Sequence, residues 1–303
     1  MFFNSISFYA VFIVFLTIYA VLQRTSRTLM MLYVALFSLL FFSRMNPEVA
    51  ILLPLTALLS WSMTRRMNEC KGALRKRWLW FIIAVDLMPL LYFKYTNFGI
   101  DVLNTLLSQN LPMQDIILPV GISFYTFQAI AHTVDVYRRH LRLKMDFLEY
   151  IFYLSFFPLL LAGPITRPGI MLQPIRENKG ANPRLLYTGL WLVMMGILKK
   201  CVVADYIAQF NNWAFDEPIL YNGFELLMAT VGFSVQIYCD FSGYSDMSIG
   251  IAAMMGFRLR ENFNFPYQSL NVSEFWRRWH ISLSTWFRDY VYIPLGGNRT
   301  NKI

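Results

Sequence analysis

The sequence predicts an all-α membrane protein that crosses the bilayer several times. Hydrophobic residues make up 56% of the 303-residue chain and charged residues only 15%, whereas soluble domains carry about 25% charged residues. The mean hydropathy is +0.43, and apolar runs recur along most of the chain. No linker, repeat or low-complexity tract separates these runs, so residues 1–303 are predicted to form one membrane domain.

Roughly eight membrane elements are expected. A bilayer-crossing helix needs about 20 mostly apolar residues, and several runs are shorter, which favours tilted or re-entrant segments. The first run has no basic region before it and no small-residue cleavage site after it, so it is interpreted as a span and not as a signal peptide. The runs are residues 5–22, 29–43, 49–63, 78–95, 116–136, 147–162, 185–203 and 224–238.

Lys and Arg in the loops predict the orientation. Residues 64–77 and 137–144 are rich in basic side chains, whereas residues 96–115 contain two aspartates and no basic residue. Because short cytoplasmic loops are enriched in Lys and Arg, the first two loops are predicted to be cytoplasmic and the third external. The basic loop 164–184 does not fit simple alternation, which implies a re-entrant segment or a different count. The net charge of +9 then reflects these loops and not nucleic-acid binding.

Residues 262–299 form the most informative segment because Trp, Tyr, Arg and one histidine are concentrated there. Charged groups are costly at membrane depth and usually mark a functional site. Trp276, Trp279, Leu283 and Trp286 recur at spacings of three or four, which predicts one face of an interfacial helix.

His280 is the main catalytic candidate. On a helix, Arg277 at i−3 and Ser284 at i+4 would share its face, and an imidazole beside a hydroxyl and a guanidinium can move a proton near neutral pH. Arg277 and Arg278 are candidates for binding an anionic donor or acceptor. The alternative is an interfacial helix with snorkelling arginines and tryptophan anchors.

A second candidate cluster lies at the end of an apolar run. Gln236, Asp240 and Gly243 would share one helix face, and an aspartate at membrane depth is a site hypothesis by default. A break at Ser242 and Gly243 is expected, and Asp246 would not join the cluster. The alternative is a structural polar contact between helices, worth about 1 kcal/mol.

Three further positions carry weaker signals. Arg167 lies in a Gly- and Pro-bounded turn, residues 163–169, where it would hold an anionic group or simply face a membrane surface. His132 precedes Asp135 by three residues, which suggests either a proton relay or, more simply, the end of a span. Lys199 and Lys200 are expected to end a helix at a membrane face. The three cysteines fit no metal-binding spacing.

Several motifs in one order resemble the membrane-bound O-acyltransferase (MBOAT) family, and within it the bacterial alginate O-acetyltransferase membrane subunits. The D-alanyl-lipoteichoic acid branch is similar up to the Trp-His motif, but the ending at residues 292–299 looks like the acetylase branch. The motifs are LPVGISFYTFQ at residues 118–128, DVYR at 135–138, AGPI at 162–165, QIYCDFSGYSD at 236–246 and YIPLGGNR at 292–299.

The resemblance implies a ring of tilted, partly re-entrant helices around a funnel that narrows near His280. It implies acetyl transfer from a cytoplasmic thioester, such as acetyl-CoA, to hydroxyls of an exported, alginate-like polysaccharide. His280 matches the family histidine of the Trp-His-Ile-Ser-Leu motif. The resemblance also implies periplasmic or membrane O-acetylation partner proteins, a bacterial inner-membrane location, no metal and no tightly bound cofactor. Substrate contacts are assigned to Arg277, Arg278, Ser284, Asp240, Gln236 and Arg167.

The chain departs from the family pattern after residue 299. Family members continue to a second Trp-His motif, whose histidine is the principal catalytic residue, and no such motif is present in these 303 residues. The chain is therefore expected to be an N-terminal part of a longer enzyme and inactive alone. The alternatives are D-alanyl transfer to teichoic acid, a non-catalytic acyl-transport component, and an inactive fragment.

Overall fold

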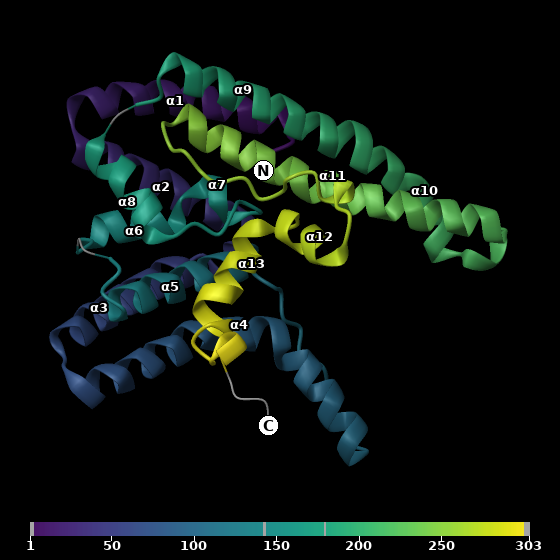
Figure 1. Ribbon diagram of the computed structural model, residues 1–303, viewed down its shortest axis with the longest axis horizontal. Coiled ribbons are helices and arrows are strands. Elements are labelled where there is room, and N and C mark those ends of the chain that lie inside the picture. The colour runs from purple at the N-terminus through teal and green to yellow at the C-terminus, as the bar shows by residue number, and fades with distance from the viewer. Residues whose placement is uncertain (1–2, 142–143, 179, 300–303) are drawn as a thin grey trace. The chain divides into compact units, whose positions relative to one another are not determined.

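A computed structural model describes residues 3–141, 144–178 and 180–299, and every regular element in these ranges is helical (Figure 1). Arg142, one of the basic residues used to predict orientation, lies outside the described residues. The contacts divide the chain into two compact units. The predicted all-α class is confirmed, whereas the single domain, the ring and the funnel stay predictions.

Unit 2 comprises Ser26–Leu161 and Ile165–Glu177. A buried carboxylate, Glu149, joins three of its helices, because it forms ion pairs with Arg27 of α2 and with Arg176 of α8, whose Nε lies 2.8 Å from Glu149 Oε1. The helices are α2 (Arg27–Met45), α3 (Leu52–Glu69), α4 (Gly72–Leu107), α5 (Ile122–Tyr137), α6 (Phe147–Ser155), α7 (Phe157–Leu160) and α8 (Pro168–Glu177), with a 3-10 turn, η1 (Pro47–Val49).

Unit 1 comprises Met1–Thr25, Ala162–Pro164 and Asn178–Ile303. Its α-helices are α1 (Ile6–Thr25), α9 (Pro183–Ile197), α10 (Asp205–Asp216), α11 (Gly223–Met254), α12 (Val272–Arg278) and α13 (Ile281–Phe287). Its shorter elements are two π-helical segments, η2 (Leu198–Ala204) and η5 (Arg288–Tyr292), and three 3-10 turns, η3 (Pro218–Leu220), η4 (Pro266–Gln268) and η6 (Gly297–Arg299).

Four helical segments of the described chain are long and apolar enough to cross a membrane: Ile6–Thr25, Arg27–Met45, Pro47–Glu69 and Gly72–Leu107. On α1, large apolar side chains such as Ile13 remain exposed opposite the buried Phe8, Phe12 and Phe15. A helix that is apolar all round is typical of a segment in contact with lipid.

The other four predicted spans fall on shorter, broken or more polar helices. Residues 116–136 overlap α5, which begins only at Ile122. Residues 147–162 overlap α6 and α7, residues 185–203 overlap α9 and η2, and residues 224–238 fall on the first half of α11. The predicted external loop 96–115 is wrong in its first part, because α4 continues to Leu107.

Helices α9 and α11 lie side by side and antiparallel (Figure 1), and glycines line their contact. A Cβ atom added to Gly196 would lie 2.6 Å from the carbonyl oxygen of Gly243, and one added to Gly189 would lie 2.6 Å from that of Gly250. Small residues at such spacing let helix backbones approach closely. The predicted helix break at Ser242–Gly243 is therefore wrong: α11 runs straight through it, and Gly243 serves as a contact surface.

The prediction that Lys199 and Lys200 end a helix is also wrong. Both residues lie in η2, which connects α9 to α10 without a loop. π-Helical turns insert an extra residue into a helix and are frequent at functional sites. Here the π-helical segment places the two lysines opposite acidic residues.

Candidate active site

His280 lies at a break between two short helices. Helix α12 ends at Arg278 and α13 begins at Ile281, and the φ angle of His280 is 43°. This left-handed conformation is unusual for a residue with a Cβ atom and is found disproportionately at functional sites. The prediction that Trp276, Trp279 and Trp286 share one continuous helical face is therefore wrong, because the helix is interrupted between them.

The same break separates His280 from its predicted helical neighbours. Arg277 is exposed, and Arg278 is half-buried with its Nη2 2.6 Å from Glu274 Oε1. Ser284 is exposed on α13. A single helix no longer places Arg277, His280 and Ser284 side by side, so the geometric reason for grouping them is lost, although their roles in substrate binding stay predictions.

The imidazole of His280 is held by a side-chain amide and by two aromatic rings. Its Nδ1 lies 3.1 Å from Asn262 Oδ1, and its ring centroid lies 4.8 Å from that of Phe241 and 6.3 Å from that of Phe263. Within the described chain, Nε2 forms no hydrogen bond. Burial lowers the pKa of His280 to about 4, so the ring is neutral near pH 7.

An aromatic cluster lies beside the imidazole of His280. Its rings come from three elements of unit 1: α11, the segment between α11 and α12, and α12 with the residue that follows it. Trp279 is central, with its ring 5.1 Å from Phe263 and 5.5 Å from Phe275. The cluster consists of Tyr238, Phe241, Phe263, Tyr267, Phe275 and Trp279. Such packing restricts the position of the imidazole.

The low pKa of His280 predicts how unfolding depends on pH. The folded pKa of about 4 lies below the unfolded value of about 6.5, so the unfolded chain binds the proton more readily. The contribution of His280 to stability is therefore complete above about pH 6.5 and is lost as pH falls toward 4. Histidine NMR titration of the detergent-solubilised protein is expected to give this low pKa, and a value at or above 6.5 would contradict it.

The second predicted cluster is engaged in polar contacts inside unit 1. Lys200 Nζ lies 2.5 Å from Asp240 Oδ1 and 2.7 Å from Asp205 Oδ1, and Lys199 Nζ lies 2.6 Å from Asp246 Oδ2. The side-chain amides of Gln236 and Asn211 are hydrogen-bonded at 2.7 Å. These contacts support the structural interpretation of Gln236 and Asp240, whose substrate contacts stay predictions.

Replacing Lys200 by methionine is expected to destabilise unit 1 by about 1–3 kcal/mol, because two carboxylates lose a charge-assisted partner. Lys199→Met is the matched control, since it leaves only one carboxylate, Asp246, without its lysine. Thermal unfolding in detergent would measure both variants. If Lys200→Met loses no more stability than Lys199→Met, the second ion pair of Lys200 contributes nothing to the stability of unit 1.

The remaining candidates lie in unit 2. Arg167 is half-buried directly before α8, and its predicted role in anion binding stays untested. His132 is 3% exposed and its ring centroid lies 4.6 Å from that of Tyr150, which supports a place in the core more than a proton relay. No group of three or more His, Cys, Asp or Glu side chains among the described residues could hold a metal ion.

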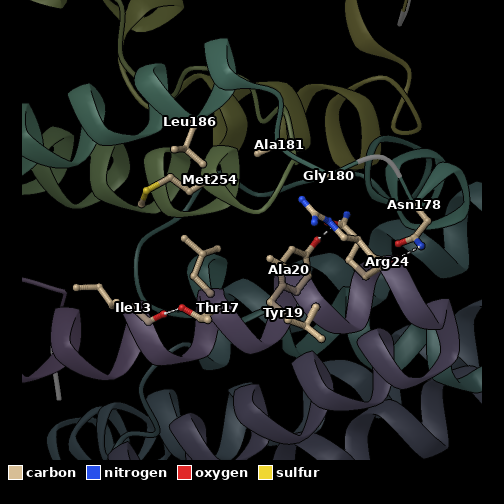
Figure 2. Close-up of a pocket in the computed structure, with 13 residues that line it drawn as sticks. Ile13, Thr17, Tyr19, Ala20, Arg24, Asn178, Gly180, Ala181, Leu186 and Met254 are labelled. Carbon is tan, nitrogen blue, oxygen red and sulfur yellow. Dashed lines mark hydrogen bonds between the residues drawn. The ribbon is translucent and has the colours of Figure 1, made fainter.

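Unit 1 also contains a pocket of about 820 Å³ along α1 (Figure 2). Arg24 and Asn178 lie at one end, and Ile13 and Met254 lie at the other. Asn178 closes the polar end by donating from Nδ2 to the backbone oxygen of Gln23 at 2.9 Å. None of the predicted site residues lines this pocket, so it is not the site around His280.

Comparison with known families decides the class of the chain. The sequence model of the membrane-bound O-acyltransferase family matches residues 90–303. This range includes α11, the aromatic cluster and His280.

The chain belongs to the membrane-bound O-acyltransferase family.

Several curated proteins are similar to this chain in sequence, and the names of those described here refer to acyl transfer. A probable alginate O-acetylase, AlgI, of Pseudomonas aeruginosa is 42% identical over 74% of this chain and 44% of its own length. A peptidoglycan O-acetyltransferase of Helicobacter pylori is 33% identical over 90% of this chain and 57% of its own. A teichoic acid D-alanyltransferase of Bacillus subtilis is 31% identical over 60% of this chain and 47% of its own. The chain spans less than half of the AlgI relative that it matches.

In this MBOAT chain, sequence reasoning singled out His280 but missed the residue that holds it. Asn262 is 18 residues away and is brought to the imidazole by the turn between α11 and α12. The pairing of Lys199 and Lys200 with aspartates was also missed. The sequence shows Asn262 at the start of the aromatic segment, and it shows the two lysines and the aspartates of residues 240 and 246. Only the tertiary fold reveals that Asn262 contacts His280 and that the lysines pair with the aspartates.

Proposed function

We propose that the complete gene product transfers an acetyl group from a cytoplasmic thioester to hydroxyls of an exported polysaccharide. The observation that carries this proposal is His280: a neutral imidazole, held by an amide and aromatic rings, with Nε2 free of partners in the described chain. Membership of the MBOAT family supplies the reaction class.

In the proposed reaction the acceptor hydroxyl oxygen attacks the thioester carbonyl. A C–O bond forms, the C–S bond breaks, and the hydroxyl proton is finally transferred to the leaving thiolate. A pKa near 4 makes His280 a weak base, so its role is to accept a hydrogen bond from the hydroxyl and orient it. The stronger base is the second family histidine, which the resemblance places after the Gly-Gly-Asn-Arg motif.

The acyl group is proposed to be acetyl, with acetyl-CoA or another acyl thioester as donor. AlgI of Pseudomonas aeruginosa, named an alginate O-acetylase, is 42% identical to this chain, whereas the D-alanyltransferase of Bacillus subtilis is 31% identical over a shorter stretch. Arg277 and Arg278 are proposed to attract the anionic donor or an acidic acceptor. Ser284, Gln236, Asp240 and Arg167 are proposed as further substrate contacts.

The proposed location is the bacterial inner membrane, with the basic segments 64–77 and 137–144 on the cytoplasmic side. That orientation lets the protein take its donor from the cytoplasm and deliver the acyl group outward. Membrane or periplasmic O-acetylation proteins are proposed as partners for delivery to the polysaccharide.

The test uses the complete gene product, purified and reconstituted in lipid vesicles with acetyl-CoA and an alginate oligosaccharide. Mass spectrometry of the oligosaccharide identifies the acyl group. An added acetyl group supports the proposal. Transfer of D-alanine from a carrier thioester would contradict it and favour D-alanyl transfer to teichoic acid. Acetyl transfer that requires a second protein with its own catalytic residues would favour the acyl-transport alternative.

A further inference from the structure

Asn262 makes four hydrogen bonds to residues 280–282, where the chain breaks between α12 and α13. The residue is 1% exposed. Its Oδ1 lies 3.1 Å from His280 Nδ1, 3.1 Å from the backbone nitrogen of Ser282 and 2.9 Å from Ser282 Oγ. Its backbone oxygen accepts from Ile281 N at 2.9 Å. Two oxygens of one residue therefore bind three consecutive residues, 280–282.

These contacts determine which atom of the Asn262 amide faces His280. The backbone N–H of Ser282 is a donor and cannot accept, so the atom facing it must be the amide oxygen and not the amide nitrogen. The same oxygen faces His280 Nδ1. Because a carbonyl oxygen only accepts, Nδ1 must carry the proton in the neutral ring, and Nε2 must be the unprotonated acceptor.

The segment around Asn262 also supports the strained backbone of His280 from both sides. Asn264 N donates to Arg278 O at 3.0 Å before the break, and Asn262 O accepts from Ile281 N after it. A non-glycine residue in the left-handed region costs on the order of 1–3 kcal/mol and persists only where its surroundings enforce it. The direction of the imidazole is thus set by residues 262–264.

The choice of asparagine has a chemical consequence. Asn262 Nδ2 is buried and has no hydrogen-bond partner among the described residues, which costs about 1–3 kcal/mol. An aspartate would offer the same acceptor without this unpaired N–H, but its charge would favour the protonated imidazole. Asparagine therefore supplies an acceptor that fixes the tautomer and leaves the ring neutral.

We propose that Asn262 is a positioning residue that holds His280 as the Nδ1–H tautomer and directs the Nε2 lone pair at the acceptor hydroxyl. The inference rests on the proposed acyl transfer for its functional meaning, but the tautomer itself exists independently of any reaction. Asn262 acts through His280 and need not touch the substrate.

The first experiment measures the tautomer. The complete gene product, labelled with ¹⁵N-histidine and reconstituted in vesicles, is studied by solid-state NMR at pH 7, where each ring nitrogen shows whether it bears a proton. His280→Gln identifies the signal of interest. Protonated Nδ1 and bare Nε2 are expected for His280, and the opposite tautomer would overturn the inference even in an inactive preparation.

The second experiment measures rate with three variants. Asn262→Ala is expected to lower kcat roughly 10- to 100-fold with little change in KM for the thioester, and to give a mixture of tautomers. Asn262→Asp retains the acceptor, so it is expected to keep the Nδ1–H but to shift the acid limb of the pH–rate profile to higher pH, since a carboxylate raises the pKa of His280. Apart from the amide oxygen of Asn262, the ring faces Phe241 and Phe263, and no charged group contributes to its pKa.

Asn271→Ala is the matched control. Asn271 Oδ1 accepts from Glu274 N at 2.9 Å and caps α12, so this variant also loses a hydrogen bond from asparagine to the backbone in the same region. It is expected to retain kcat and the tautomer. Equal losses in Asn262→Ala and Asn271→Ala, with an unchanged tautomer in both, would reduce Asn262 to a structural residue. Absence of acetyl transfer in every preparation, with the expected tautomer present, would refute the proposed function and leave the hydrogen-bond assignment standing.

Discussion

Replacing His280 by glutamine in the complete gene product is expected to lower the rate of acetyl transfer by roughly 100-fold, the loss expected when an attacking group is no longer correctly oriented. The amide oxygen of glutamine can also accept a hydrogen bond, but glutamine lacks the ring that Asn262, Phe241 and Phe263 hold in one orientation. The loss should fall on kcat, because the interaction with the acceptor hydroxyl strengthens as the hydroxyl attacks the carbonyl.

The control is His140→Gln. His140 is exposed beyond the end of α5 in unit 2, so its loss should leave both rate and folding unchanged. Acetyl incorporation into the polysaccharide, measured by mass spectrometry at equal protein levels, compares the two variants. Unchanged acetylation in His280→Gln or His280→Ala would remove His280 from the mechanism and with it the main support for the site.

The apolar runs predicted the helices well because a membrane helix satisfies all its backbone hydrogen bonds internally and needs only length and apolarity. The run at residues 29–43 became α2, and that at 5–22 became α1, with ends shifted by a few residues. The errors lie where tertiary contacts decide. Residues 242–243 look like a break in sequence, yet packing against α9 keeps α11 helical through them.

The candidate site was predicted as a set of residues and not as a geometry. Sequence periodicity placed Arg277, His280 and Ser284 on one helical face, but the hydrogen bonds from residues 262–264 stabilise a left-handed residue at His280 and end the helix. Such a break depends on partners 14–20 residues distant in the chain, which a local pattern cannot reveal. The motif identified the residue, and the turn before α12 determined its orientation.

Gly196→Ala is expected to destabilise unit 1 by on the order of 3 kcal/mol, although alanine is the better helix former by about 1 kcal/mol. The added Cβ would lie 2.6 Å from Gly243 O, 2.6 Å from Met247 Cγ and 2.9 Å from Met247 N. Two of these three atoms belong to the backbone of α11, which cannot move aside as a flexible side chain would. Overpacking of this kind outweighs the gain in helix propensity.

Gly99→Ala is the matched control, because Gly99 also lies inside a long helix, α4, but a Cβ there would meet nothing within 4 Å. This variant is expected to be neutral or slightly stabilising. The thermal unfolding temperature in detergent should therefore fall for Gly196→Ala and stay unchanged or rise slightly for Gly99→Ala. Gly196→Ala should also reduce acetyl transfer, because α11 carries Phe241, which packs against His280; a stable, fully active Gly196→Ala protein would show that the close contact of α9 and α11 is not required to hold the site.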